Sequence, residues 1–221
     1  CCAKAMEKGI DDVAFLMDAV DQLGEVLPID RSRVYAFGVS NGAMLAHQLA
    51  AREPDRVAAI AAVSGNIGRR LPSGEADFQL VPPAGGVPVM IIHGSEDPRL
   101  PIQGRARDEG QPVDEGFGTL PVVEGARFWA RANRCSQESA QPASYDNVSL
   151  IRWSGGGSGK PVLMYELAGW GHRWAGISPH TEADHTQGGG FETVEVIWEF
   201  FKAYRSAVAP GARSSDPDSL R

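Results

Sequence analysis

The sequence predicts an α/β protein with three layers, in which helices cover both faces of a mostly parallel central sheet. Apolar runs of strand length recur along the chain, at 33–37, 57–63, 87–94 and 162–167. Segments with helical periodicity lie between these runs. Buried strands that alternate with helices are typical of a parallel sheet, because each crossover helix packs back onto the sheet.

The first helix is predicted between Asp11 and Pro28. Asp11 and Asp12 place negative charge at its start, where the helix dipole favours it, and Pro28 ends it. Apolar residues recur at helical spacing between these ends, which predicts a face packed on the protein. The residues of this face are Val13, Leu16, Met17, Val20, Leu23 and Leu27.

Three further helices and one hairpin are predicted from the rest of the chain. A helix covers 43–50, and a Gly-rich turn at 155–160 joins two strand-like runs as a hairpin. Two other segments carry apolar residues at helical spacing. These residues are Gly125, Phe128, Trp129 and Ala132 in one segment, and Val194, Ile197, Trp198 and Phe201 in the other.

A Gly-x-Ser-x-Gly motif at 38–42 joins the first predicted strand to the following helix. In such a turn the glycines let the backbone bend sharply, so that the serine hydroxyl projects above the sheet. Ser40 is therefore the candidate nucleophile, and the backbone N–H of Asn41 is a candidate oxyanion donor. The alternative is a chance Gly/Ser turn, which the strand and helix on either side make less convincing.

An acid and a base follow later strands in the order that a Ser, Asp, His triad requires. Asp97 comes directly after the run 87–94, and His172 comes directly after the run 162–167. His172 would accept the proton of Ser40, and Asp97 would orient the imidazole and stabilise its cation. Other aspartates lack a preceding strand and are interpreted as loop carboxylates, namely Asp77, Asp108, Asp114 and Asp146.

Several sequence motifs together resemble the extracellular polyhydroxybutyrate depolymerase-like esterases, a group to which feruloyl and acetylxylan esterases are close. The resemblance covers most of residues 1–204. The motifs that carry it lie at 1–2, 9–15, 29–35, 38–42, 54–60, 93–98, 171–174 and 197–201.

The resemblance implies an α/β-hydrolase fold and a serine carboxylic-ester hydrolase with no metal or organic cofactor. It matches Ser40, Asp97 and His172 to the triad, and it implies an extracellular or periplasmic protein. Implied substrates are small or polymeric esters, such as polyhydroxyalkanoates, feruloyl or acetyl groups on polysaccharide, and simple acyl esters. Trp174 matches a tryptophan of the group, and both Trp170 and Trp174 are candidates for substrate binding, with core packing as the alternative.

The sequence departs from the group in two ways. No early strands or His-Gly-Gly loop precede the elbow, so we expect that an N-terminal portion with the second oxyanion donor is missing from the sequence. The three cysteines are Cys1, Cys2 and Cys135, and the group's second cysteine downstream of Cys135 is absent here. The pairing of these cysteines stays open.

Composition and net charge limit which other classes of function the protein can have. The 221 residues are 43% hydrophobic with a net charge of −7, which argues against nucleic-acid binding through clustered cations. No apolar stretch approaches the roughly 20 residues of a membrane helix. We therefore expect one catalytic domain over 1–205, lacking its N-terminal strands, and a disordered tail over 206–221, with the oligomeric state undetermined.

Other histidines and polar residues are interpreted as structural. His93 and Ser64 end buried strands, and His47 lies within the helix 43–50, where a hydrogen-bonded structural role is expected. A metal site at His180, Glu182, Asp184 and His185 is a weak alternative to a flexible loop, and the loops 99–120 and 176–190 are expected to form the substrate cleft. The functional alternatives are a serine peptidase of the same fold and a non-catalytic fragment or binding module.

Overall fold

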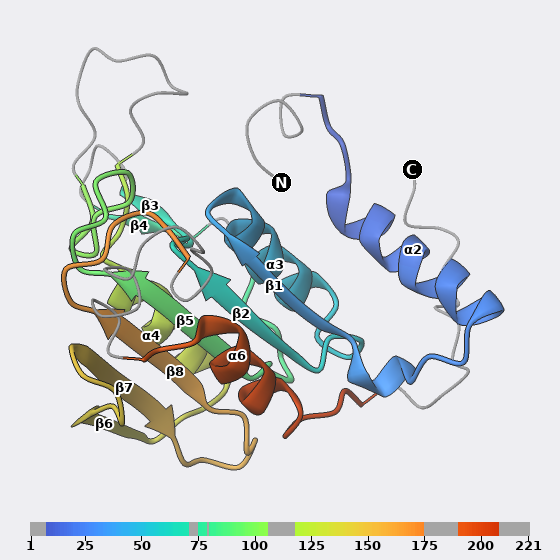
Figure 1. Cartoon of the computed structure of the whole chain (residues 1–221). Helices are drawn as coiled ribbons and strands as arrows, with labels where there is room; N and C mark the ends of the chain where they lie inside the picture. Colours follow the sequence, from blue (N-terminus) through green and yellow to red (C-terminus); the bar gives the residue numbers. More distant parts are fainter. Residues whose placement is uncertain (1–7, 71–74, 79, 106–117, 175–189, 208–221) are drawn as a thin grey trace.

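The computed structural model describes residues 8–70, 75–78, 80–105, 118–174 and 190–207. Within them a six-stranded sheet has the order β1-β2-β5-β8-β7-β6, and its first four strands run parallel (Figure 1). The strands are β1 (Tyr35–Val39), β2 (Ala59–Val63), β5 (Val89–Gly94), β8 (Val162–Leu167), β7 (Val148–Ser154) and β6 (Gln137–Pro142). The predicted α/β fold with a mostly parallel sheet is confirmed.

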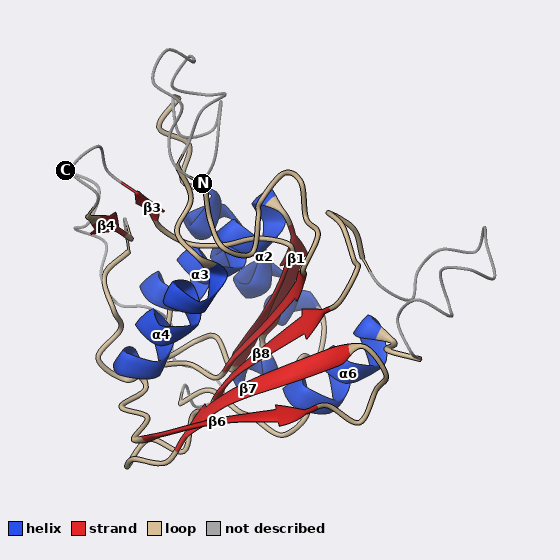
Figure 2. Cartoon of the chain, turned by 90° about the vertical axis from the view of Figure 1, so that its left-hand side faces the viewer, coloured by secondary structure: helices blue, strands red, loops and turns tan. Residues whose placement is uncertain are grey.

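Helices cover both faces of this sheet, as predicted. Figure 2 shows α2, α3 and α4 on one face and α6 on the other. The helices are α2 (Asp12–Val26), α3 (Asn41–Arg52), α4 (Val122–Ala132) and α6 (Thr193–Phe201), with a short 3₁₀ turn at η1 (Arg31–Arg33). Among the described helices, none combines the length and the apolar character that spanning a bilayer requires.

Each face of the sheet has its own apolar core. Along β5 the side chains of Val89 and Ile91 join the cluster under α3 and α4, and those of Met90 and Ile92 join the cluster under α6. This alternation follows from the two-residue period of a strand. Because both faces are covered, every residue of β5 is buried, which explains the continuous apolar run in the sequence.

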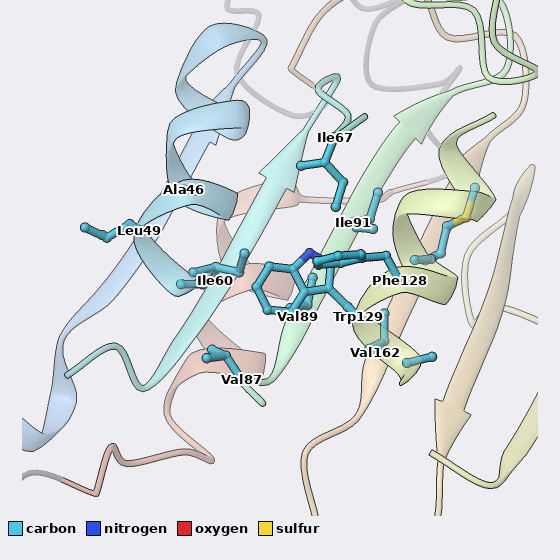
Figure 3. Packing of buried hydrophobic residues seen from close by; sticks show 14 of the residues in the cluster. Ala46, Leu49, Ile60, Ile67, Val87, Val89, Ile91, Phe128, Trp129 and Val162 are labelled. Carbon is cyan, nitrogen blue, oxygen red and sulfur yellow. The ribbon is translucent and has the colours of Figure 1, made fainter. Parts of the chain in front are cut away.

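Trp129 of α4 is the largest fully buried side chain on the α3 and α4 face. Figure 3 shows its ring over the sheet close to Val89 and Ile60. Its indole Nε1–H donates to Nδ1 of His47 on α3 over 2.9 Å, so one hydrogen bond joins the two helices inside the core. His47 is therefore structural, as the sequence predicted.

Two features of the fold differ from the sequence-based expectation. The strand β6 was not predicted because its residues, QESAQP, are polar; it pairs antiparallel with β7 at the end of the sheet. In α2, Val13 and Met17 pack into the core as expected, but Leu23 is 48% exposed. The first helix therefore contacts the described core mainly through its first half.

A short two-stranded sheet lies apart from the main sheet, formed by β3 (Arg69–Arg70) and β4 (Ala76–Asp77). The predicted hairpin between β7 and β8 is confirmed by their antiparallel pairing, which sets Trp153 opposite Val162. The predicted tail over 206–221 lies almost wholly outside the described residues.

Candidate active site

Ser40 occupies a strained turn between β1 and α3. Its backbone has φ 55° and ψ −118°, a left-handed conformation that is costly for a residue with a side chain. Surrounding hydrogen bonds maintain it, since Ser40 N donates to Val63 O over 2.9 Å and Ser40 O accepts from Ala43 N and Met44 N over 3.0 and 3.1 Å. The predicted elbow is thus present as strand, turn and helix.

Two glycines allow this turn, and only one of them, Gly38, belongs to the motif. A Cβ on Gly38 would lie 2.3 Å from the carbonyl carbon of Gly42, so position 38 requires glycine. A Cβ on Gly42 would meet nothing within 4 Å. The second is Gly65, which no sequence motif indicates. A Cβ on Gly65 would lie 2.7 Å from Ser40 O, so glycine at this position leaves room for the turn.

Asp97 is buried in the loop after β5, with 3% of its surface exposed. Its Oδ1 accepts the backbone N–H groups of Arg99 and Leu100, each over 2.9 Å. Its Oδ2 accepts from Nδ1 of His172 over 2.8 Å. A buried carboxylate with this set of donors is satisfied at both oxygens, and it is held in one orientation.

The loops that carry Asp97 and His172 are tied together at the carboxyl end of the sheet. Glu96 N donates to Trp170 O over 2.9 Å, and a Cβ on Gly94 would lie 2.2 Å from the same carbonyl oxygen. Glycine at position 94 therefore permits the close approach of the two loops. This approach is what brings a residue after β8 into contact with one after β5.

The hydrogen bond to Asp97 assigns the tautomer of a neutral His172. Because an ionised carboxylate only accepts, Nδ1 carries the proton and Nε2 is left with its lone pair. The His172 side chain is 12% exposed, so the ring borders solvent while its partner carboxylate does not. This arrangement suits a general base.

Ser40 lies at the same edge of the sheet as the Asp97 and His172 pair, because the carboxyl ends of parallel strands meet there. Two strand spacings, about 10 Å, separate β1 from β5. The pairing of Ser40 with His172 remains a prediction. Asn41 is exposed and is the first residue of α3. Its N–H therefore lies at a helix N-terminus, where the helix dipole favours negative charge.

The two tryptophans beside His172 lie in different surroundings. Trp170 is 3% exposed and joins the apolar cluster under α6, with the Arg173 guanidinium 4.5 Å from its ring centroid. Trp174 is half-buried and meets the exposed ring of Phe37 edge-on at 5.5 Å. This burial favours core packing for Trp170, and Trp174 remains the better candidate for substrate contact.

The other candidate groups either lie elsewhere or fall outside the described residues. Asp146 is exposed in a turn, consistent with a loop carboxylate. The Cys135 thiol is free and half-buried, and burial raises its pKa. Within the described ranges no cluster of three metal-ligating side chains occurs. The residues outside the description are Cys1, Cys2, Asp108, Asp114, His180, Glu182, Asp184 and His185, together with most of the two predicted cleft loops.

Comparisons with known proteins give one family and two curated relatives. Residues 3–110 match a family described as phospholipase/carboxylesterase. The proposed esterase NocK of Nocardia uniformis subsp. tsuyamanensis is 33% identical over 175 residues, which cover 75% of this chain and 49% of that protein. Feruloyl esterase B of Piromyces equi is 23% identical over 174 residues, covering 78% of this chain and 30% of the enzyme.

The chain thus spans about half the length of one curated relative and less than a third of the other. Among solved structures, a thermostable esterase aligns with 87% of this chain and 36% of its own, at 16% identity and a TM-score of 0.49. The acetyl xylan esterase from Aspergillus awamori aligns with 81% of this chain and 67% of its own, at 18% identity and a TM-score of 0.47.

Proposed function

We propose that the chain is a serine carboxylic-ester hydrolase of the α/β-hydrolase fold, and the match of residues 3–110 to a phospholipase/carboxylesterase family supports this proposal. One observation carries the proposal. The buried Asp97 carboxylate holds His172 over 2.8 Å at the sheet edge where Ser40 occupies its strained turn. Strain of this kind, costing about 1–3 kcal/mol, clusters at functional sites.

The proposed reaction runs through an acyl-enzyme. His172 Nε2 takes the proton of Ser40 as Oγ attacks the ester carbonyl carbon, and the oxygen that becomes negative lies against the N–H of Asn41. The imidazolium, stabilised by Asp97, returns the proton to the leaving alkoxide as the C–O bond breaks. Water then attacks the acyl-enzyme by the same route and frees Ser40.

The proposal extends to the substrates of the protein and to its location. The names of the relatives favour feruloyl esters, as in feruloyl esterase B, and carboxylic esters more generally. The resemblance in the sequence motifs adds polyhydroxyalkanoates and an extracellular or periplasmic location. Trp174 and the exposed Phe37 beside it provide an aromatic surface that suits an aromatic acyl group.

The direct test is hydrolysis of p-nitrophenyl acetate and butyrate, together with labelling by a fluorophosphonate. Ser40→Ala should lower turnover by about 10⁴- to 10⁶-fold and abolish labelling, because no other group replaces the nucleophile. Ser64→Ala is the matched control. Ser64 also follows a parallel strand, β2, with a positive φ of 46°, yet the proposal gives it no chemical role.

Three outcomes would contradict the proposal. Ester cleavage and labelling that persist in Ser40→Ala would exclude Ser40 as the nucleophile. The absence of ester turnover and of fluorophosphonate labelling, both in this folded chain and in an N-terminally extended one, would favour the alternative of a non-catalytic module. Cleavage of amide substrates at rates above those of matched esters would instead indicate a peptidase.

A further inference from the structure

His93 is a buried titratable residue that the proposed triad does not use. It lies next to last in β5, and its side chain has no exposed surface. The strand period places it on the same face as Val89 and Ile91, under the loop that carries Asp97. Burial of a polar ring at this level of the core calls for hydrogen bonds that compensate its desolvation.

One ring nitrogen of His93 faces the Asp97 loop. Nε2 lies 2.7 Å from the backbone carbonyl of Leu100 and 3.5 Å from Oδ2 of Asp97. Since a carbonyl oxygen only accepts, Nε2 carries the proton and donates it to Leu100 O. Within the part of the chain that the structure describes, Nδ1 has no hydrogen-bond partner.

Leu100 is consequently held at both ends of its backbone. Its N–H donates to Oδ1 of Asp97 over 2.9 Å, and its C=O accepts from His93 over 2.7 Å. His93, Leu100 and Asp97 form a chain of hydrogen bonds that runs from the rigid central strand to the carboxylate. The orientation of the carboxylate relative to His172 is therefore tied to β5 through His93.

The neutral state of His93 matters for the charge of Asp97. Burial is the main cause that lowers the pKa of His93, with His172 acting in the same direction and Asp97 opposing it. Glu166, the register partner on β8, is the other titratable neighbour in the sheet. A neutral donor fixes the loop without a full positive charge, so the Asp97 carboxylate remains available to stabilise the His172 imidazolium.

We propose that His93 is a positioning residue, which anchors the Leu100 carbonyl so that Asp97 keeps the orientation in which it holds His172. This inference rests on the proposed function for its kinetic consequence, although its structural part does not require activity. His93 touches no reacting atom and acts only through Asp97. Residues that orient a catalytic group in this way affect activity by about 10- to 100-fold.

The test compares two substitutions of similar size, His93→Gln and His93→Met. The glutamine Nε2 lies as many bonds from Cα as the histidine Nε2 and can donate to Leu100 O, whereas the methionine fills the same space without a donor. We expect His93→Met to lower kcat about 10- to 100-fold with little change in KM. His93→Gln should retain kcat within about threefold.

A spectroscopic measurement separates this inference from the proposed function. The His172 Nδ1 proton, shared with a buried carboxylate, should give a low-field proton NMR signal in wild type and in His93→Gln, and this signal should weaken or vanish in His93→Met. Thermal unfolding checks that both variants fold. If wild type shows the signal but no turnover, the proposed function fails and the positioning role is still decided by the variants.

Equal kcat values in the two variants, or a His93→Met variant that keeps both the signal and the turnover, would overturn the inference. A shift in the lower limb of the pH profile of kcat/KM offers a second readout. Loss of the anchor should move this limb, because a displaced Asp97 stabilises the imidazolium less. An unchanged limb in an impaired His93→Met variant would indicate a merely structural role.

Discussion

The candidate site residues at the centre of the sheet and at its β1 edge are held in place in different ways. At the centre, all six residues of β5 are buried, and Asp97 is held by three hydrogen bonds. At the edge, no residue of β1 is fully buried, and Phe37 is 58% exposed. Asp97 and His172 are thus fixed by side-chain contacts, whereas backbone hydrogen bonds hold Ser40 in a strained conformation at the end of a partly exposed strand.

This difference separates two kinds of preorganisation. A buried carboxylate and imidazole hold each other because their alternatives in a dry environment are unfavourable. A strained serine keeps its conformation only while the elements around it are packed. Changes at the centre should therefore act mainly on chemistry, and changes near β1 should act mainly on stability.

Asp97→Asn should produce a larger effect than the other changes below. The amide cannot replace both the charge and the acceptor that set the His172 tautomer, so kcat for p-nitrophenyl acetate should fall by about 10⁴-fold with the fold intact. Glu96→Gln, which changes the exposed neighbouring carboxylate, should leave kcat unchanged. Comparable losses in the two variants would mean that Asp97 is not the acid of the site.

Gly38→Ala should act on stability at the edge. Its Cβ would lie 2.3 Å from the Gly42 carbonyl carbon, so we expect a loss of about 1–3 kcal/mol in the free energy of unfolding. Gly42→Ala is the matched control, because its Cβ meets nothing within 4 Å and alanine favours the helix. Urea denaturation measures the stability of both variants. Equal stabilities would contradict the requirement for glycine at position 38.

His47 should make the link between α3 and α4 sensitive to acid. Burial lowers its pKa to about 3 from 6.5, so the unfolded chain takes up a proton before the folded one, and stability present above about pH 6.5 is lost as the pH falls toward 3. Between pH 7.5 and 5.5 this loss is on the order of 1 kcal/mol.

The check on this sensitivity is His47→Asn, whose side-chain oxygen can still accept from Trp129 but does not titrate. Denaturation midpoints of the variant should depend less on pH across this window than those of wild type. A variant with the same pH dependence as wild type would assign the acid sensitivity to other groups.

The smallest effect is expected at the ion pair between Asp11 and Arg52, which joins α2 to α3 over 2.6 Å. The Arg52 hydrogen bond lowers the Asp11 pKa to about 2, so its contribution is present above about pH 4 and is lost as the pH falls toward 2. Because both side chains are almost half exposed, Asp11→Asn should cost about 0.5 kcal/mol or less. High salt should remove the difference between variant and wild type, since exposed pairs are screened; a difference that survives salt would indicate an effect on the helix cap.

The sequence by itself determined the parallel strands, the helices between them, and the candidate residues Ser40, Asp97 and His172. Strands buried on both faces require continuous apolar runs, and the site residues follow these strands directly, so local patterns sufficed. The antiparallel β7 and β8 were likewise evident from the Gly-rich turn between them.

Only the tertiary structure decided the rest. The polar β6 is a strand because β7 supplies its hydrogen bonds, and Trp170 is buried because α6 covers it. Chain segments distant in sequence, or a loop that folds back, likewise decide three smaller features. These are the steric need for Gly65, the exposure of Leu23 and the contact of His93 with Leu100. Residue type and spacing report what a segment prefers, whereas burial and hydrogen-bond partners are set by which other segments pack against it.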